Sequence, residues 1–241
     1  MKLLASIVVI AAVALAPQTA GAVAIGQIDT FEDGTTEGWF AGGGPFGAMP
    51  PNPPQVVDTG GPGGAGDAFL QITAVGGSGG PAPQPGSRLS ANNTLQWAGD
   101  YLTAGVTGIA MDLRNLGTSD LTIRLLFEDP IPGPPVNVAV TSGALLPAGG
   151  DWTRVVFPVS AADLTALSGD PTVLLSQVTF VRIVHSPTPG LPIPQVSGVL
   201  GVDNISAIPE PSSLALVASA ALAGLTAYRR RRSFSREGSG S

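Results

Sequence analysis

Glycine and proline interrupt the middle of this chain so often that no long helix fits between them. The 241 residues include 33 Gly and 23 Pro, and one proline inside a helix costs about 3 kcal/mol. Between these residues, short segments alternate apolar and polar side chains with the period of two that marks a strand with one buried face. The sequence therefore predicts an all-β domain of short strands and tight turns.

The clearest alternation lies in two neighbouring segments, Gly108–Asn115 and Leu121–Glu128. A five-residue connection separates them, which favours an antiparallel hairpin. With further candidates, about eight strands are expected, arranged as an antiparallel β-sandwich or jelly roll. A brief helix is expected within 161–168, led by Ser160 as its cap. The other candidate strands are Ile28–Phe31, Gln55–Asp58, Ala68–Ala74, Trp152–Pro158, Val178–His185 and Val199–Ile205.

The first residues are typical of a secretory signal peptide. Lys2 precedes an apolar run, Leu3–Ala16, and small residues follow through Ala24. This order is that of a segment removed during export, and cleavage after Ala22 or Ala24 fits it best. A permanent N-terminal anchor is the alternative, which the short run disfavours. Residues 1–24 are therefore predicted to be a signal helix.

A second apolar run lies near the C-terminus. It follows Pro209-Glu210-Pro211, extends over Leu214–Ala227 and precedes a cluster of arginines. A helix over 212–228 would be about 26 Å long, near the lower limit for crossing a bilayer. The basic cluster would hold its end on the cytoplasmic side. The pattern predicts one hydrophobic transmembrane helix with the domain outside, stopped by Arg229, Arg230, Arg231 and Arg232.

The order of a Pro-Glu-Pro motif, a short apolar span and a basic cluster over 208–232 resembles the PEP-CTERM sorting signal. Proteins with this signal are exported in Gram-negative bacteria, many of which make exopolysaccharide. The resemblance implies an envelope, cell-surface or biofilm-matrix location. It also implies that an exosortase, a membrane-embedded cysteine transpeptidase, acts at Pro209, Glu210 and Pro211, so that the helix holds the membrane only transiently. A permanent single-pass anchor is the competing interpretation, and 233–241 is expected to be a disordered tail.

The predicted sandwich domain, 25–207, is strongly acidic. It holds five arginines and fifteen aspartates and glutamates, a net charge of about −10. Such a surface repels nucleic-acid phosphates, which argues against DNA or RNA as a partner. The chain has no cysteine, which excludes thiol catalysis, thiolate metal sites and disulfides.

Three short segments resemble galactose-binding-like jelly rolls, the fold of many carbohydrate-binding modules. They are Phe31–Gly34, Gly150–Val155 and Val202–Ile205. In that fold the first and last strands lie close together, and a structural Ca²⁺ often sits between them. The resemblance carries over Glu32 and Asp203 as ligands, with Asp33 and backbone carbonyls as further candidates. The alternative is that Glu32 and Asp33 are turn residues and Asp203 is an edge carboxylate.

Sugar binding needs exposed aromatic faces with polar groups beside them. Trp97, near Tyr101, is the best candidate for such a platform, since the other tryptophans are expected to pack at strand ends. Arg114 and Arg124 are expected on the outward face of their strands, either as a polar binding surface or as a solvated ion-pair face.

The sequence does not show the set of residues that a catalytic centre needs. His185 is the only histidine, and nothing marks a nucleophile for it. A paired-carboxylate motif of the kind used by jelly-roll glycosidases is also missing. The sequence favours a non-enzymatic surface or matrix protein whose domain contacts exopolysaccharide or other envelope components. A structural coat protein without a ligand is the runner-up, and a secreted glycan hydrolase is third.

Overall fold

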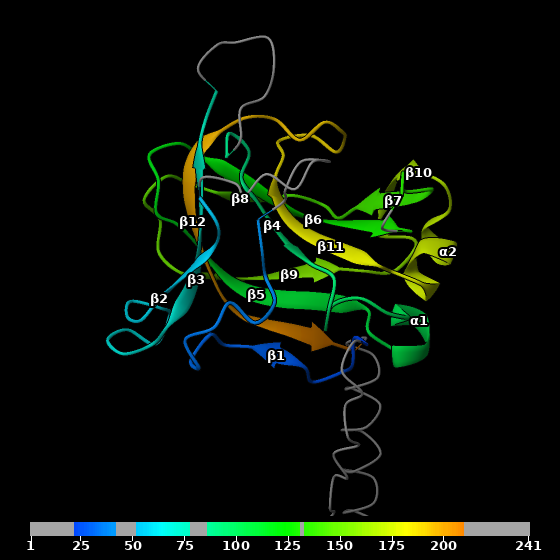
Figure 1. Ribbon diagram of the computed structural model, residues 1–241, viewed down its shortest axis with the longest axis horizontal. Helices are drawn as coiled ribbons and strands as arrows, with labels where there is room; N and C mark the ends of the chain where they lie inside the picture. The colour runs from blue at the N-terminus through cyan, green and yellow to red at the C-terminus, as the bar shows by residue number, and fades with distance from the viewer. Residues whose placement is uncertain (1–21, 42–51, 78–85, 131–132, 210–241) are drawn as a thin grey trace, which may run out of the picture.

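The computed structural model describes residues 22–41, 52–77, 86–130 and 133–209, within which two six-stranded antiparallel sheets pack face to face (Figure 1). The predicted all-β sandwich is therefore confirmed. The expected signal helix, the C-terminal helix, Glu210, Pro211 and the four arginines lie outside these residues. In the described part of the chain, no helix has the length and apolarity to cross a membrane.

The first sheet has the strand order β2-β3-β12-β5-β9, with β1 added beside β12. Its central strand, β12, is the last strand of the described residues, and it pairs with β1, the first of them. The strands are β1 (Ile28–Asp29), β2 (Gln55–Val57), β3 (Phe69–Val75), β5 (Gly108–Asn115), β9 (Thr153–Pro158) and β12 (Ser197–Ile208).

The second sheet has the order β10-β7-β6-β11-β4, with β8 added beside β6. Its strands are β4 (Ser90–Asn93), β6 (Leu121–Asp129), β7 (Asn137–Val140), β8 (Ala144–Leu146), β10 (Thr165–Ser168) and β11 (Phe180–His185). Two short helices lie at one end, α1 (Tyr101–Ala104) and α2 (Pro171–Ser176), capped by the side chains of Asp100 and Asp170.

Two local predictions were wrong. Gly108–Asn115 and Leu121–Asp129 do not form a hairpin, because β5 pairs with β12 and β9 while β6 pairs with β11, β7 and β8. Alternation reports that a strand has one buried face but does not identify its partner, and the connection between these strands crosses from one layer to the other. The helix expected within 161–168 is replaced by β10, which bonds to β7.

The core lies between the sheets. Met111 and Leu113 of β5 face inward, as do Leu125 and Phe127 of β6, and all four are fully buried. Burial of each such side chain contributes about 1.5–3 kcal/mol. A second, smaller apolar cluster covers the outer face of the second sheet. Its members are Leu126, Val138, Val140, Val184 and Ile193.

The first described residues are part of the packed domain. Val23 is only 3% exposed, and its backbone N–H donates to the Ala98 carbonyl at 2.8 Å. The Gly26 N–H donates to the carbonyl of Ala207 on β12 at 3.1 Å. The chain therefore joins the sandwich before Ile25.

We expect signal-peptide cleavage after Ala22, which leaves Val23 as the first residue of the exported protein. Cleavage after Ala24 would remove a buried valine that contributes about 1.5–3 kcal/mol. Mass spectrometry of the N-terminal peptide of the exported protein checks this expectation. A mature chain that starts at Ile25 would contradict it.

Candidate functional site

Trp97 and Tyr101 do not form an exposed platform, so that prediction was wrong. Both side chains are completely buried. The indole N–H of Trp97 donates to an Asp29 carboxylate oxygen at 2.7 Å, and the Tyr101 hydroxyl donates to the Trp97 carbonyl at 2.9 Å. The Tyr101 ring also packs edge-on against Phe127. The polar neighbours of Trp97 in sequence suggested exposure, but its polar atom has a partner inside the domain.

Asp29 is the centre of this buried polar cluster. It is 3% exposed, and one carboxylate oxygen accepts hydrogen bonds from the indole N–H groups of Trp39 at 2.8 Å and Trp97 at 2.7 Å. The Gln96 amide donates to the same oxygen at 3.2 Å. Three side-chain donors from two separate segments thus depend on one acceptor.

Glu37 adds a second carboxyl group to the cluster. One of its oxygens accepts from the backbone N–H groups of Thr30 at 3.1 Å and Phe31 at 2.8 Å. Burial, together with the nearby charge of Asp29, raises the pKa of Glu37 to about 7, and burial also raises the pKa of Asp29. Phe31 and Glu37 have φ values of 60° and 47°, in the left-handed region. Through these two hydrogen bonds, the Glu37 side chain holds the strained turn that runs from Phe31 to Glu37.

Arg124 is buried rather than solvated. Its guanidinium donates to the carbonyls of Ser186 at 2.9 Å, Thr141 at 2.9 Å and Pro187 at 3.2 Å. It therefore fastens surrounding loops to the second sheet, and the prediction of an open binding or ion-pair face was wrong for it. Arg114 is half-buried and donates to the Gly150 carbonyl at 3.1 Å.

His185 is also buried. Its Nδ1 accepts from the Thr122 backbone N–H at 3.0 Å, and burial lowers the pKa of the imidazole. This histidine is therefore neutral and buried, and its side chain joins β11 to β6.

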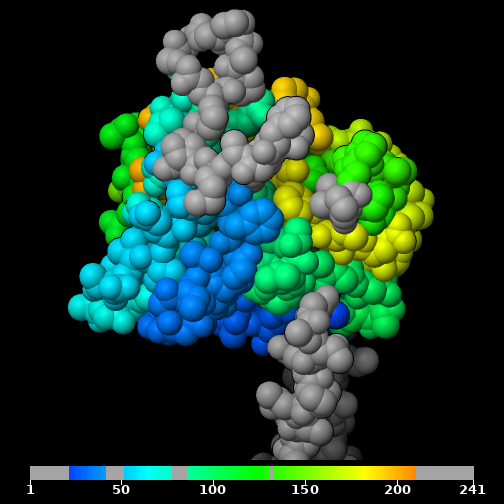
Figure 2. Space-filling model, viewed as in Figure 1, coloured from blue at the N-terminus to red at the C-terminus, as the bar shows by residue number. Residues whose placement is uncertain are grey.

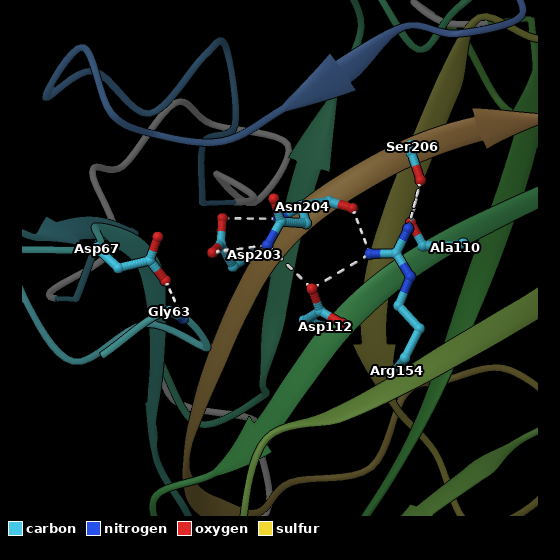
Figure 3. A network of polar contacts seen from close by, with 8 residues as sticks. All are labelled: Gly63, Asp67, Ala110, Asp112, Arg154, Asp203, Asn204 and Ser206. Carbon is cyan, nitrogen blue, oxygen red and sulfur yellow. Dashed lines mark hydrogen bonds and ion pairs between the residues drawn. The ribbon is translucent and has the colours of Figure 1, made fainter. Parts of the chain in front are cut away.

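Asp203 lies in an acidic cluster on the outer face of the first sheet (Figure 3). It is 1% exposed and accepts hydrogen bonds from the backbone N–H of Asn204 at 2.6 Å and from its amide at 3.1 Å. Burial and the charges of Asp67, Asp112 and Glu32 raise the pKa of Asp203 to about 7. Asp112, by contrast, pairs with Arg154 at 3.3 Å. The cluster therefore has an excess of negative charge at Asp203.

Asp33 lies apart from that cluster. It is exposed, and its carboxylate accepts from the Thr35 N–H and hydroxyl, both at 2.8 Å, which lowers the pKa of Asp33. It is thus a turn residue. Glu32 accepts from the Ala68 N–H at 2.9 Å. No three acidic or histidine side chains among the described residues come close enough to hold a metal by themselves.

A different surface carries an exposed aromatic ring. Phe40 pairs with Asn92 of β4, and on the next strand Arg182 lies opposite Asn92. On β11, Val181 and Ile183 lie on either side of Arg182 and point into the core, so Arg182 points outward. Residues opposite one another on antiparallel strands share a face. We name this surface the aromatic face and define it as Phe40, Asn92, Glu128, Phe180 and Arg182.

The aromatic face is tightly arranged. The rings of Phe40 and Phe180 meet edge-on with centroids 6.2 Å apart, and the Arg182 guanidinium carbon lies 4.6 Å from the Phe180 centroid. Arg182 Nη2 pairs with the buried Glu128 carboxylate at 2.8 Å. Phe40 is 41% exposed, the only exposed aromatic side chain in the described ranges. Figure 2 shows the blue segment 22–41 crossing between the cyan 52–77 and the green residues around β4 and α1.

A groove of about 480 Å³ opens at the end of β4 and β11 that also bears Phe180. It is lined by Thr94, Ala98, Gly99, Asp100 and residues 176–179. The exposed Phe40 ring can stack on the flat apolar face of a ring-shaped ligand, while the nearby Arg182 guanidinium hydrogen-bonds the ligand's hydroxyl groups. Sequence reasoning missed this surface, although Phe180 and Arg182 alternate with apolar Val181 and Ile183.

The C-terminal segment matches a known family model. Residues 207–232 match the PEP-CTERM protein-sorting motif. The chain carries this sorting signal. The motif marks an exported, envelope-associated protein processed by an exosortase, and the match begins inside β12, two residues before Pro209. No curated protein matches the sequence as a whole.

The sandwich is similar in fold to carbohydrate-binding modules. A family 11 module from Clostridium thermocellum, in complex with a β-1,3-1,4-mixed-linked tetrasaccharide, has a TM-score of 0.51 and 18% identity over 77% of this chain and 97% of that one. The family 11 module of a cellulosomal cellulase from the same organism has a TM-score of 0.50 and 15% identity, over 78% and 96%. An exo-β-agarase has a TM-score of 0.50 and 12% identity, over 78% of this chain but 25% of that one. These similarities confirm the jelly-roll fold.

Proposed function

We propose that the sandwich is a non-catalytic carbohydrate-binding module, sorted to the envelope, where it contacts exopolysaccharide. The observation that carries the proposal is the exposed Phe40 ring beside the Arg182–Glu128 ion pair on the outer face of the second sheet. The fold shared with carbohydrate-binding modules and the sorting motif support it.

Each part of the aromatic face has a role in this proposal. Phe40 stacks on the C–H face of a pyranose ring. Arg182 hydrogen-bonds its hydroxyl groups, and Glu128 holds the guanidinium in place. The enclosed Asn92 amide donates to the Phe40 carbonyl at 3.2 Å and so fixes the segment that bears the ring. Arg182 Nε is a buried donor without a hydrogen-bond partner in the described part of the chain. Because this atom is enclosed, the exposed part of the Arg182 side chain, 28%, supplies the contact with the sugar.

Replacing Phe40 with alanine is expected to weaken binding to the host's exopolysaccharide about tenfold, since loss of one stacking ring costs roughly 1–1.5 kcal/mol. Isothermal titration calorimetry measures the affinity. Val156→Ala is the matched control, because Val156 is also exposed but lies on the other sheet. Equal affinities of Phe40→Ala and the control would contradict the proposed site.

The two alternatives give different results. A coat protein without a ligand would show no retention of the parent domain on any polysaccharide, the host's own included. A hydrolase would turn over a glycan even after extensive purification, and the carboxyl pair Asp29–Glu37 is its best candidate centre. Their oxygens already accept hydrogen bonds from two indoles and two backbone N–H groups, which favours a structural role for the pair.

We also propose that a structural Ca²⁺ binds at Asp203. Asp203 is a buried carboxylate with other acidic groups around it, and a bound cation would compensate their negative charge. Asp203 and Glu32 would supply carboxylate oxygens, and backbone carbonyls and water the remaining ligands, which suits a cation that accepts six to eight oxygens. Asp33 does not fit, because its carboxylate holds Thr35. The ion would supply charge compensation and would fasten β12 to the turn that follows β1.

Adding a chelator should lower the melting temperature of the parent protein by roughly 5–10 °C, because a site saturated a hundredfold above its dissociation constant contributes about 2.7 kcal/mol. Differential scanning calorimetry with EDTA and with added Ca²⁺ measures the difference. Asp203→Asn should abolish it, whereas Asp33→Asn should keep it. An unchanged melting temperature in EDTA would remove the calcium proposal.

A further inference from the structure

The sorting motif joins the folded domain without a linker. The Thr107 N–H donates to the carbonyl of Ile208 at 3.1 Å, and Ile208 pairs with Gly108 of β5. Ile208 is the last residue of β12, and Pro209 follows it directly. The first two residues of the matched motif, 207 and 208, are thus strand residues.

Apolar side chains gather around this exit point. We define the exit patch as Ile25, Ile28, Leu102 and Val156, which are 48–53% exposed. Ile28 lies opposite Ser206, Ser206 opposite Ala110, and Ala110 opposite Val156, so Ile28 and Val156 are the two ends of one row across four strands. Between them the Ser206 hydroxyl accepts from Arg154 at 2.7 Å. That row lies just before Ile208 on β12.

Ile25 and Leu102 extend the patch around the end of the sandwich. The Gly26 N–H bonds to Ala207, which places Ile25 beside the end of β12. A Cβ atom on Gly105, the cap of α1, would lie 3.5 Å from Ile25 Cδ1, so Ile25 also reaches the helix that bears Leu102. Figure 1 shows β1, α1 and the tip of β12 at the same end of the molecule.

The chain length beyond Ile208 brings this end close to the bilayer. Only residues 209–213 separate it from the apolar run that begins at Leu214. Fully extended, this connection spans about 20 Å, and the headgroup layer takes up roughly 5–8 Å of it. The opposite end of β12, eleven residues away at Ser197, lies roughly 36 Å along the strand from Ile208.

We propose that the exit patch rests on the lipid surface while the precursor is held by its tail. This rests on the proposed membrane span of 214–227. The domain is acidic, so anionic lipid repels it, and apolar contact supplies the attraction. Contact is therefore stronger on zwitterionic than on anionic vesicles. The position would present the Pro-Glu-Pro motif at the depth where a membrane-embedded transpeptidase works.

Single cysteines test the proposal cleanly because the chain has none of its own. The full chain carries an environment-sensitive fluorophore at Leu102→Cys or, as the matched control, at Val75→Cys, a slightly more exposed site paired with Ser197 at the far end. It is reconstituted in phosphatidylcholine vesicles that contain spin-labelled lipid. We expect at least threefold stronger quenching at 102 than at 75. Equal quenching, or none at either site, would overturn the docking.

Vesicle flotation separates this result from failure of the membrane span. A chain that floats without quenching at 102 keeps the span and refutes the docking, whereas a chain that does not float refutes both. Replacing Ile25 and Ile28 together with serine should reduce quenching at 102 by half or more while the chain still floats. Quenching that appears only after an exosortase is added would overturn lipid as the partner of the patch.

Discussion

Replacing Asp29 with alanine is expected to destabilise the domain by about 4 kcal/mol. The change leaves the indole N–H groups of Trp39 and Trp97 buried without an acceptor, together with one donor of Gln96. Each buried unsatisfied donor costs roughly 1–3 kcal/mol. Since domains of this kind are stable by about 5–15 kcal/mol, this change removes a large share of the total. Urea unfolding followed by tryptophan fluorescence measures the loss.

Asp29→Asn is the informative companion variant. Its amide oxygen can still accept from both indoles, and its NH₂ group can donate to Glu37, so we expect a loss of no more than about 1 kcal/mol. Asp58→Ala, at an exposed carboxylate, controls for removal of one charge. If Asp29→Ala is as stable as Asp58→Ala, the buried cluster does not stabilise the fold.

Stability is expected to fall by about 2 kcal/mol between pH 5 and pH 8 through the carboxyl pair. The pKa of Glu37 is raised to about 7 in the folded state, from 4.5, and that of Asp29 is raised as well. The folded state therefore binds more protons than the unfolded state across this window. The stabilisation is fully present below about pH 4.5 and is lost as the pH rises through 7. The figure allows for solvent screening of the partly exposed Glu37.

Glu37→Gln should remove most of this slope, because its amide stays neutral and can donate to Asp29 while its oxygen keeps the Thr30 and Phe31 N–H bonds. We expect the variant to match the parent at pH 5 and to exceed its stability by about 1–2 kcal/mol at pH 8. Asp151→Asn, at an exposed site, is the control. If the stability of Glu37→Gln depends on pH as strongly as that of the parent, the raised pKa of Glu37 is not the cause of the pH dependence. Melting curves at several pH values, in EDTA, supply the measurement.

Period-two alternation predicted most strands and therefore the sandwich, because a strand with one buried face leaves that pattern whatever its partner. Alternation did not predict which strands pair. The sequence therefore favoured a hairpin of β5 and β6, although these two strands lie in different sheets. The order of Pro-Glu-Pro, apolar run and arginines predicted the sorting motif, since that signal is local in sequence.

The candidate site was predicted less well because its parts meet only through tertiary structure. Trp97, in the turn after β4, is buried because Asp29 of β1 accepts its indole N–H. The aromatic face joins Phe40 from one edge segment to Phe180 and Arg182 of β11. The charge excess at Asp203 depends partly on Asp67 and Asp112, which no sequence motif links to it.

Binding of a glycan to the aromatic face can be measured directly by NMR. The described termini pair with each other at β1 and β12, so the sandwich closes its core without the two ends of the chain, and the domain can be isotope-labelled for NMR. Titration with the host's exopolysaccharide should shift the resonances of Phe40, Asn92, Phe180 and Arg182 first and most. Shifts confined to other surfaces, or none at saturating polysaccharide, would contradict the account.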